Sequence, residues 1–170
     1  MQKYSRIIST GSYLPEKILT NKDLEKMVDT SNEWIIERTG IESRHIASED
    51  ESSVDMAYNA SINAIKNADI NPNPNTIDMI IVATTTPERK FPSTAVLLQN
   101  KLKNNRAFAF DLNAACTGFI YALDIANTYI KNGIANHVLV VGTEKITSLL
   151  DWSDRNTCVL FRDGAGAALL

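Results

Sequence analysis

One cysteine lies where a strand pattern changes into a helix pattern, and that position suits covalent catalysis. Residues 107–110 form a short apolar run typical of a buried strand, and helical spacing of apolar residues begins at about Thr117. Cys116 lies between them, where free backbone N–H groups and the helix dipole favour a thiolate over a thiol. Its small neighbours Ala115 and Gly118 would let a substrate carbonyl approach the sulfur. The pattern resembles the strained strand-turn-helix elbow that exposes hydrolase nucleophiles.

A structural role is the alternative for Cys116, because free cysteine is among the most buried residue types. The chain has two cysteines, Cys116 and Cys158, which do not make a disulfide framework. Its two histidines, His45 and His137, have no metal-ligand spacing with either cysteine. The sequence therefore predicts free thiols and no metal site.

A tryptophan and an arginine four residues apart form the second candidate group. Thr30 and Glu33 form a capping-box pattern that would open a short helix, so Trp34 and Arg38 share a face. The pair is either a structural cation–π contact or a stacking platform for an adenine ring, with Arg155 as a second cationic plate. The sequence pattern leaves both interpretations open.

The elements that must position these groups alternate between strands and helices. Continuous apolar runs at 77–85 and 138–141 indicate strands buried on both faces, as in parallel sheets. Further strands are expected at 5–13, 41–47, 158–161 and 165–170, and helices at 52–68, 93–103 and 117–132. The alternation predicts an α/β fold with right-handed crossovers.

Two of these helices carry informative faces. Ser52 and Asp55 cap the helix expected at 52–68, whose small-residue face would suit close packing on a sheet. That face consists of Ala57, Ala60, Ala64 and Ala68. The helix after Cys116 has apolar residues at 3–4 spacing, namely Phe119, Ile120, Leu123, Ala126 and Ile130.

Length and charge restrict the class of protein. A chain of 170 residues is one ordinary domain, and its net charge of −3 gives no electrostatic case for nucleic acid. No apolar run reaches membrane-spanning length and no signal-peptide region opens the chain, so we expect a cytoplasmic protein without a membrane partner. The chain stops inside the apolar run at 165–170, which indicates half of a larger unit.

Six segments then identify a family resemblance, because they occur together in one order. They are TGSYLPE at 10–16, DTSNEWI at 29–35, RTGIESR at 38–44, VATT at 82–85, AACTGF at 114–119 and DGAGA at 163–167. The combination resembles β-ketoacyl-acyl carrier protein synthase III, the condensing enzyme that starts type II fatty acid synthesis. The resemblance covers essentially all 170 residues but only the N-terminal half of the family's usual length.

The resemblance implies a fold and a reaction. The fold would be a thiolase-like half, with a mixed, mostly parallel sheet and helices on both faces; residues 1–170 would be the N-terminal thiolase-fold domain. Cys116 matches the nucleophile that takes an acetyl or short acyl group from coenzyme A and passes it to malonyl-acyl carrier protein. Coenzyme A thioester would be a substrate, with no permanently bound cofactor, and the intact enzyme would be a homodimer.

The resemblance also assigns binding residues. Phe91, which in its charged loop is either a loop anchor or a pocket or interface residue, matches the position that a partner subunit contributes to the acyl pocket. The positions that match coenzyme A contacts are Thr30, Trp34, Arg38 and Arg155, and those that match acyl-pocket walls are Ile146 and Phe161.

Two departures limit what this chain would do. The family's catalytic His and Asn lie in the C-terminal half, which has no counterpart here, so we expect no condensation by the 170-residue chain alone. Arg162 stands where Gly is common, and would either perturb the pocket rim or point to solvent. The alternatives are another thiolase-fold ketoacyl synthase, or a non-catalytic fragment with a role in assembly.

Overall fold

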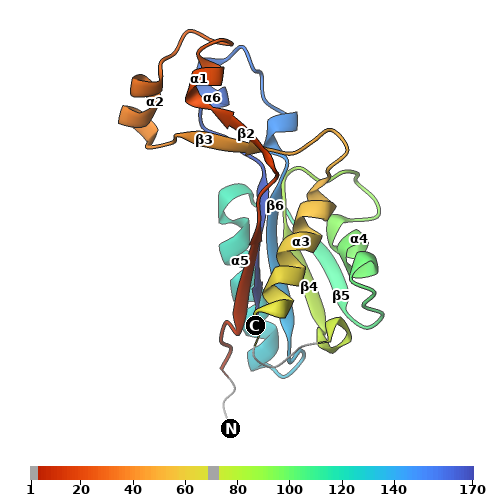
Figure 1. Cartoon of the computed structure of the whole chain (residues 1–170). Coiled ribbons are helices and arrows are strands. Elements are labelled where there is room, and N and C mark those ends of the chain that lie inside the picture. The colour runs from red at the N-terminus through yellow and green to blue at the C-terminus, as the bar shows by residue number, and fades with distance from the viewer. Residues whose placement is uncertain (1–3, 69–72) are drawn as a thin grey trace.

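A five-stranded sheet carries the larger part of the molecule. The structure is a computed structural model that describes residues 4–68 and 73–170. The strands are ordered β1-β7-β6-β4-β5 across the sheet (Figure 1). Their bounds are β1 Ser9–Tyr13, β4 Met79–Ala83, β5 Phe108–Leu112, β6 Val138–Glu144 and β7 Gly164–Leu169.

The strand directions make this a mixed sheet. β4 pairs in parallel with β5 and β6, so that Ile80 lies opposite Ala109 on one side and Leu139 on the other. β7 pairs antiparallel with both β6 and β1. β1 therefore runs in the same direction as β4, β5 and β6, and β7 runs against them. The mixed, mostly parallel α/β sheet predicted from the sequence is confirmed.

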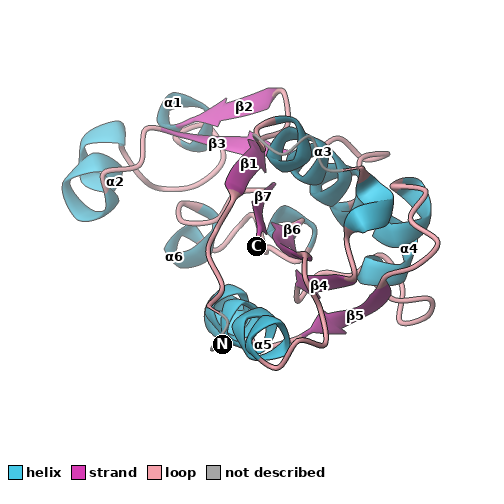
Figure 2. Ribbon diagram, turned by 90° about the horizontal axis from the view of Figure 1, so that it is seen from below, coloured by secondary structure: helices cyan, strands magenta, loops and turns pink. Residues whose placement is uncertain are grey.

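Helices cover both faces of the sheet (Figure 2). α3 and α4 pack on one face and α5 on the other, and each face has its own buried apolar cluster. The bounds are α3 Ser53–Lys66, α4 Thr94–Lys101 and α5 Gly118–Lys131. The predicted capping box opens α3, because Ser52 Oγ accepts from the Asp55 N–H and the Asp55 carboxylate accepts from the Ser52 N–H.

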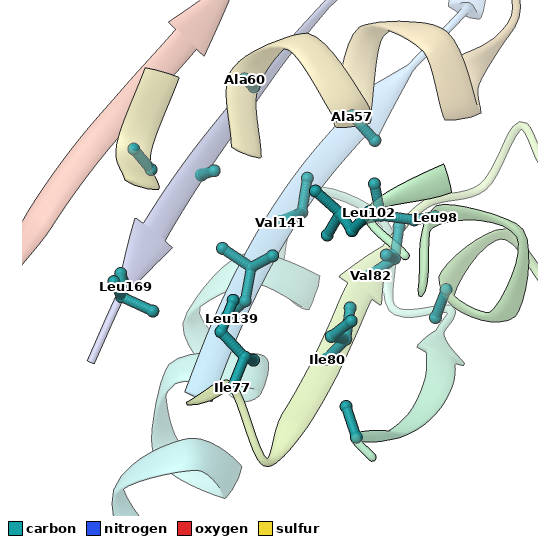
Figure 3. Packing of buried hydrophobic residues seen from close by; sticks show 14 of the residues in the cluster. Ala57, Ala60, Ile77, Ile80, Val82, Leu98, Leu102, Leu139, Val141 and Leu169 are labelled. Carbon is teal, nitrogen blue, oxygen red and sulfur yellow. The ribbon is translucent and has the colours of Figure 1, made fainter. Parts of the chain in front are cut away.

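The alanine face of α3 allows the helix to lie close on the sheet. Ala57, Ala60 and Ala64 are fully buried, and Figure 3 shows Ala57 and Ala60 on the helix above Val141 of β6. The helix approaches β1 so closely that a Cβ added at Gly11 would lie 2.2 Å from the Ala64 nitrogen. The small side chains thus permit the contact that we expected from their spacing.

The buried face of α5 differs from the predicted one. Ala122, Ala126 and Ile130 are buried at four-residue spacing, whereas Ile120 is 63% exposed. Because Ile120 lies about 200° around the helix from Ala122, it cannot face the same sheet. The helix predicted from the apolar series is confirmed, but Ile120 lies outside its narrow contact stripe.

A second, two-stranded sheet and three short helices form a small lobe at one end of the main sheet (Figure 1). Its elements are β2 Lys17–Thr20, β3 Ser43–Ile46, α1 Asn21–Leu24, α2 Asn32–Thr39 and α6 Arg155–Cys158. Leu24, Ile35, Cys158 and Val159 form its buried core. The lobe therefore joins residues from the start of the chain to a segment far along it.

The cap of α2 is Ser31 and not Thr30. Ser31 Oγ accepts a hydrogen bond from the Trp34 N–H at 3.1 Å, and Gly40 ends the helix at a φ of 68°. The capping box predicted on Thr30 and Glu33 is wrong, because the hydroxyl that accepts from the first turn of α2 is that of Ser31, whereas the Thr30 hydroxyl makes no such bond.

Two strand predictions also need correction. Residues 107–110 do not form a buried strand: β5 lies at the sheet edge, and Phe108 is 41% exposed. Residues 158–161 do not form a strand either, because Cys158 ends α6 and the Leu160 N–H closes a turn on the Thr157 carbonyl. The part of the chain that the structure describes also has three single-turn 3₁₀ helices, η1 Pro74–Thr76, η2 Ala115–Thr117 and η3 Ile146–Ser148. The Pro- and Asn-rich sequence at 71–75 predicts a turn, and its first two residues fall outside the described residues. Within 4–68 and 73–170, no helix is long and apolar enough to cross a membrane.

Candidate active site

Cys116 lies on a strained turn between β5 and α5. It is the middle residue of η2, and α5 starts two residues later at Gly118. Ala115 has a φ of 47°, in the left-handed region that a residue with a Cβ adopts at a cost. Cys116 is exposed. The alternative that Cys116 is a buried core residue is therefore wrong for this chain, and the predicted strand-turn-helix geometry is confirmed.

The sulfur-bearing residue lines a pocket at the carboxyl ends of the parallel strands. The pocket has a volume of about 630 Å³ and is lined by residues from the ends of β4 and β6 and the start of β7. Cys116, Ile146 and Phe161 all line it, so the structure brings together the predicted nucleophile and both predicted wall residues. Ligands of α/β folds bind at this edge of the sheet.

The floor of this pocket is fixed by Glu144, at the end of β6. Its carboxylate accepts hydrogen bonds from the Thr85 N–H at 2.8 Å, the Thr85 hydroxyl at 3.1 Å and the Thr86 hydroxyl at 2.5 Å. These bonds join the carboxyl end of β6 to the residues that follow β4, beside the pocket. Glu144 and Thr85 themselves line the pocket.

A second carboxylate, Asp163, joins the pocket to the small lobe. Asp163 is 1% exposed, and its oxygens accept from the Ala47 N–H at 2.8 Å and from the N–H and hydroxyl of Thr147 at 3.0 and 2.5 Å. The bonds hold η3, which carries Ile146, against the start of β7. The sequence pattern gives no functional role to Glu144 or Asp163. The available signal was their position, directly beside strands at the carboxyl edge of the sheet.

Two further predicted residues lie in different surroundings. Arg162 lines the pocket and is exposed, so it belongs to the rim. Phe91 does not line the pocket in this single chain, and 88% of its surface is exposed. The structure therefore does not bring Phe91 together with Cys116.

The aromatic group of the small lobe is assembled as its spacing predicts. The guanidinium carbon of Arg38 lies 4.6 Å from the Trp34 ring centroid, and that of Arg155 lies 5.1 Å from it. Arg155 Nη1 also donates to the Asp29 carbonyl at 2.7 Å. Two cations from α2 and α6 thus contact one indole, an arrangement that suits an anionic ligand with a flat aromatic group.

Thr30 lies next to this group and keeps one polar atom unsatisfied. Its hydroxyl oxygen is buried and has no hydrogen-bond partner among the described residues. Burying a hydroxyl without a partner is unfavourable. The predicted coenzyme A contacts Thr30, Trp34, Arg38 and Arg155 therefore lie within one lobe.

The two thiols differ in their surroundings. Cys158 is free and fully buried in the lobe core, where burial raises the pKa of its thiol, whereas Cys116 is free and exposed. Among residues 4–68 and 73–170, no group of three His, Cys, Asp or Glu side chains could hold a metal ion. Cys116 is thus the accessible thiol of the pair.

Comparison with known proteins finds the same fold and a similarity to the family that the sequence resembles. The family model described as 3-oxoacyl-[acyl-carrier-protein (ACP)] synthase III matches residues 110–170. A relative from Xanthomonas oryzae pv. oryzae, named beta-ketoacyl-[acyl-carrier-protein] synthase III, is 56% identical over 167 residues, which are 98% of this chain and 51% of the relative. The chain therefore spans about half the length of the curated relatives it matches.

Solved structures agree with this result. The 3-oxoacyl-[acyl-carrier-protein] synthase III of Aquifex aeolicus VF5 is 55% identical, with a TM-score of 0.92, over 96% of this chain and 52% of that one. The priming beta-ketosynthase of the R1128 polyketide pathway is 41% identical, with a TM-score of 0.95, over 99% of this chain and 50% of that one. The thiolase-like fold predicted from the sequence is confirmed. Over the half of their length that it spans, the chain is similar in sequence and in fold to β-ketoacyl-acyl carrier protein synthase III enzymes.

Proposed function

We propose that this chain is the N-terminal half of an acyltransferase that starts fatty acid synthesis, with Cys116 as its nucleophile. The observation that carries the proposal is the exposure of Cys116 on a strained turn, in one pocket with Ile146 and Phe161. The names of the relatives support the class of reaction. The cytoplasmic location expected from the sequence stays a prediction.

The bond changes of the first half-reaction take place in the pocket. The Cys116 thiolate attacks the carbonyl carbon of an acetyl or short acyl coenzyme A thioester, and the backbone N–H of Cys116 helps to hold the oxyanion that forms. Collapse of this intermediate forms the new thioester on Cys116 and breaks the old one. Coenzyme A leaves as a thiolate and takes up a proton. Ile146 and Phe161 contact the acyl chain.

The donor's nucleotide part binds the small lobe. Trp34 and Arg155 stack on the adenine, while Arg38 and the hydroxyl of Thr30 bind phosphate oxygens. Because Arg155 now lies 5.1 Å from the indole centroid, its side chain must turn away before a base can enter. Coenzyme A is a substrate here, and we propose no permanently bound cofactor.

The second half-reaction needs more than this chain. Malonyl-acyl carrier protein loses carbon dioxide, and the resulting enolate attacks the acyl group on Cys116. The His and Asn that stabilise this enolate belong to the other half of the family fold, so the 170-residue chain stops at the acylated cysteine. The intact enzyme is a homodimer in which Phe91 enters the partner's pocket, in keeping with its 88% exposure here.

The test is the intact mass of the chain after incubation with acetyl coenzyme A. We expect one added acetyl group, which Cys116→Ser removes and Cys158→Ala leaves in place, because Cys158 is buried in the lobe core. No carbon dioxide should be released from malonyl-acyl carrier protein. An acetyl group that persists in Cys116→Ser would refute the nucleophile, and no acetylation of the unaltered chain would favour an assembly role without catalysis.

A second candidate is a priming synthase for another product, favoured by the 41% identity and TM-score of 0.95 to the R1128 enzyme. Its nucleophile and first half-reaction would be the same, but its acyl donors would differ. Acylation rates with acetyl, butyryl and branched acyl coenzyme A separate the two. Preference for acetyl supports fatty acid initiation.

A further inference from the structure

A buried arginine lies at the centre of the small lobe without a carboxylate partner. Arg44, on β3, is 0% exposed. Its Nε donates to the Val159 carbonyl at 3.0 Å, its Nη2 donates to the same oxygen, and its Nη1 donates to the Asn21 side-chain carbonyl. No described carboxylate forms an ion pair with it. Burial lowers the pKa of the guanidinium. Burying a cation without a counter-ion costs free energy, so we ask which elements the hydrogen bonds of Arg44 hold in place.

The first bonded element is α6, which carries Arg155. Val159 is the C-cap residue of this four-residue helix, and Arg155 is the first residue of the same helix. Two of the three Arg44 hydrogen bonds therefore fix the end of a single helical turn. Through that turn Arg44 sets where Arg155 stands relative to the Trp34 ring, 5.1 Å away.

The second bonded element is α1, whose first residue Asn21 links Arg44 to α2, the helix that carries Trp34. Asn21, the acceptor for Arg44 Nη1, donates through its own amide to Asn32 Oδ1 at 3.1 Å and to the Ile41 carbonyl at 2.8 Å. Asn32 is the first residue of α2 and Ile41 follows the glycine that ends it. One buried guanidinium thus connects to both ends of α2 and to the end of α6.

We propose that Arg44 is a positioning residue that holds Trp34 and Arg155 opposite each other, so that the lobe is preformed for the flat base of a nucleotide thioester. This inference rests on the proposed function of the lobe. Arg44 bonds the backbone of α6 and not the side chain of Arg155, so that side chain can turn away while its helix stays in place. A planar fork that reaches acceptors on two elements is a property of arginine that lysine lacks.

The test begins without ligand. In a chain with Trp152→Phe, Trp34 is the one remaining tryptophan, and its quenching by acrylamide reports how well its ring is covered. We expect Arg44→Met to raise the quenching constant of Trp34 about twofold, because the Arg155 guanidinium that covers the Trp34 ring moves away. Arg44→Lys should give a smaller increase. Leu24→Val, a substitution of a fully buried residue in the same core, should lower the melting temperature without this change.

Binding gives the second readout. We expect Arg44→Met to weaken the binding of coenzyme A about tenfold, because a site that is not preformed spends more binding free energy on ordering. The affinity for pantetheine, which lacks the nucleotide, should stay unchanged. Equal weakening of both ligands, or unchanged quenching in a folded Arg44→Met chain, would overturn the proposal. If Arg44→Met does not fold, Arg44→Lys decides by the same two measurements. Failure of the unaltered chain to bind coenzyme A would refute the proposed function, while the quenching result would still decide the role of Arg44.

Discussion

Gly11→Ala should be among the most damaging single-methyl substitutions in this fold. The new Cβ would lie 2.2 Å from the Ala64 nitrogen and 2.4 Å from the Ala60 carbonyl oxygen. Both atoms belong to the backbone of α3, so no side chain can rotate to relieve the contact. Raising 2.2 Å to the 3.4 Å at which ordinary contact begins requires α3 and β1 to separate by about 1.2 Å.

That displacement would loosen a tightly packed interface. The alanine face of α3 is fully buried at Ala57, Ala60 and Ala64, so a shift of the helix opens space along its length. Overpacking of this kind costs about 1–3 kcal/mol of unfolding free energy. In a domain of this size each kcal/mol lowers the melting temperature by about 2–4 °C, which gives a decrease of about 2–12 °C.

Gly166→Ala is the matched control. Gly166 lies on β7 opposite Ser12, the residue that follows Gly11 on β1. A Cβ added at Gly166 meets nothing within 4 Å. We expect an unchanged or slightly raised melting temperature, because alanine restricts the unfolded chain more than glycine does. Thermal and urea unfolding of both variants measures the difference. Equal melting temperatures for Gly11→Ala and the unaltered chain would refute the reasoning, as would equal losses in the two variants.

Two further predictions concern a helix cap and a titrating side chain. Ser31→Ala should cost about 1 kcal/mol of unfolding free energy because it removes the cap of α2. Thr30→Val should cost nothing, since the buried Thr30 hydroxyl has no partner among the described residues. A urea unfolding experiment in which Thr30→Val is the less stable variant would contradict the assignment of the cap. The Tyr13 hydroxyl donates to Glu51 at 2.6 Å, and this bond raises the pKa of Tyr13 from 10.0 to about 12. The bond's contribution to stability is therefore complete below pH 10 and is lost as the pH rises to about 12. The unfolding free energy of Tyr13→Phe should therefore lie below that of the unaltered chain at pH 8, and the difference should shrink between pH 10 and about 12. A difference that stays constant from pH 8 to 12 would contradict this.

Local signals in the sequence predicted much of the architecture. The capping box at Ser52 and Asp55 fixed the start of α3, and the apolar runs at 77–85 and 138–141 identified the central strands β4 and β6. The change from strand to helix pattern also located Cys116 on its turn. Each of these signals lies within a few residues of the feature that it predicts.

The sequence did not predict features that depend on backbone geometry or on a residue far along the chain. Two hydroxyl residues in succession offered the same cap chemistry, and only the backbone geometry selects Ser31 over Thr30. The burial of Arg44 depends on an acceptor, Val159, that lies 115 residues along the chain. The strand predicted at 158–161 was too short to distinguish from a turn of helix.

The pocket's sulfur and its walls come from separate connections of the chain. Cys116 lies on the link from β5 to α5, whereas Ile146 and Phe161 lie on the link from β6 to β7. The bonds from Glu144 to Thr85 and Thr86 join the end of β6, where the second link begins, to the segment that follows β4. Under the proposed function, residues on the second link can therefore be exchanged to admit acyl groups of another shape while Cys116 keeps its geometry. A fold divided in this way can acquire new substrates by mutation without having to rebuild its chemistry.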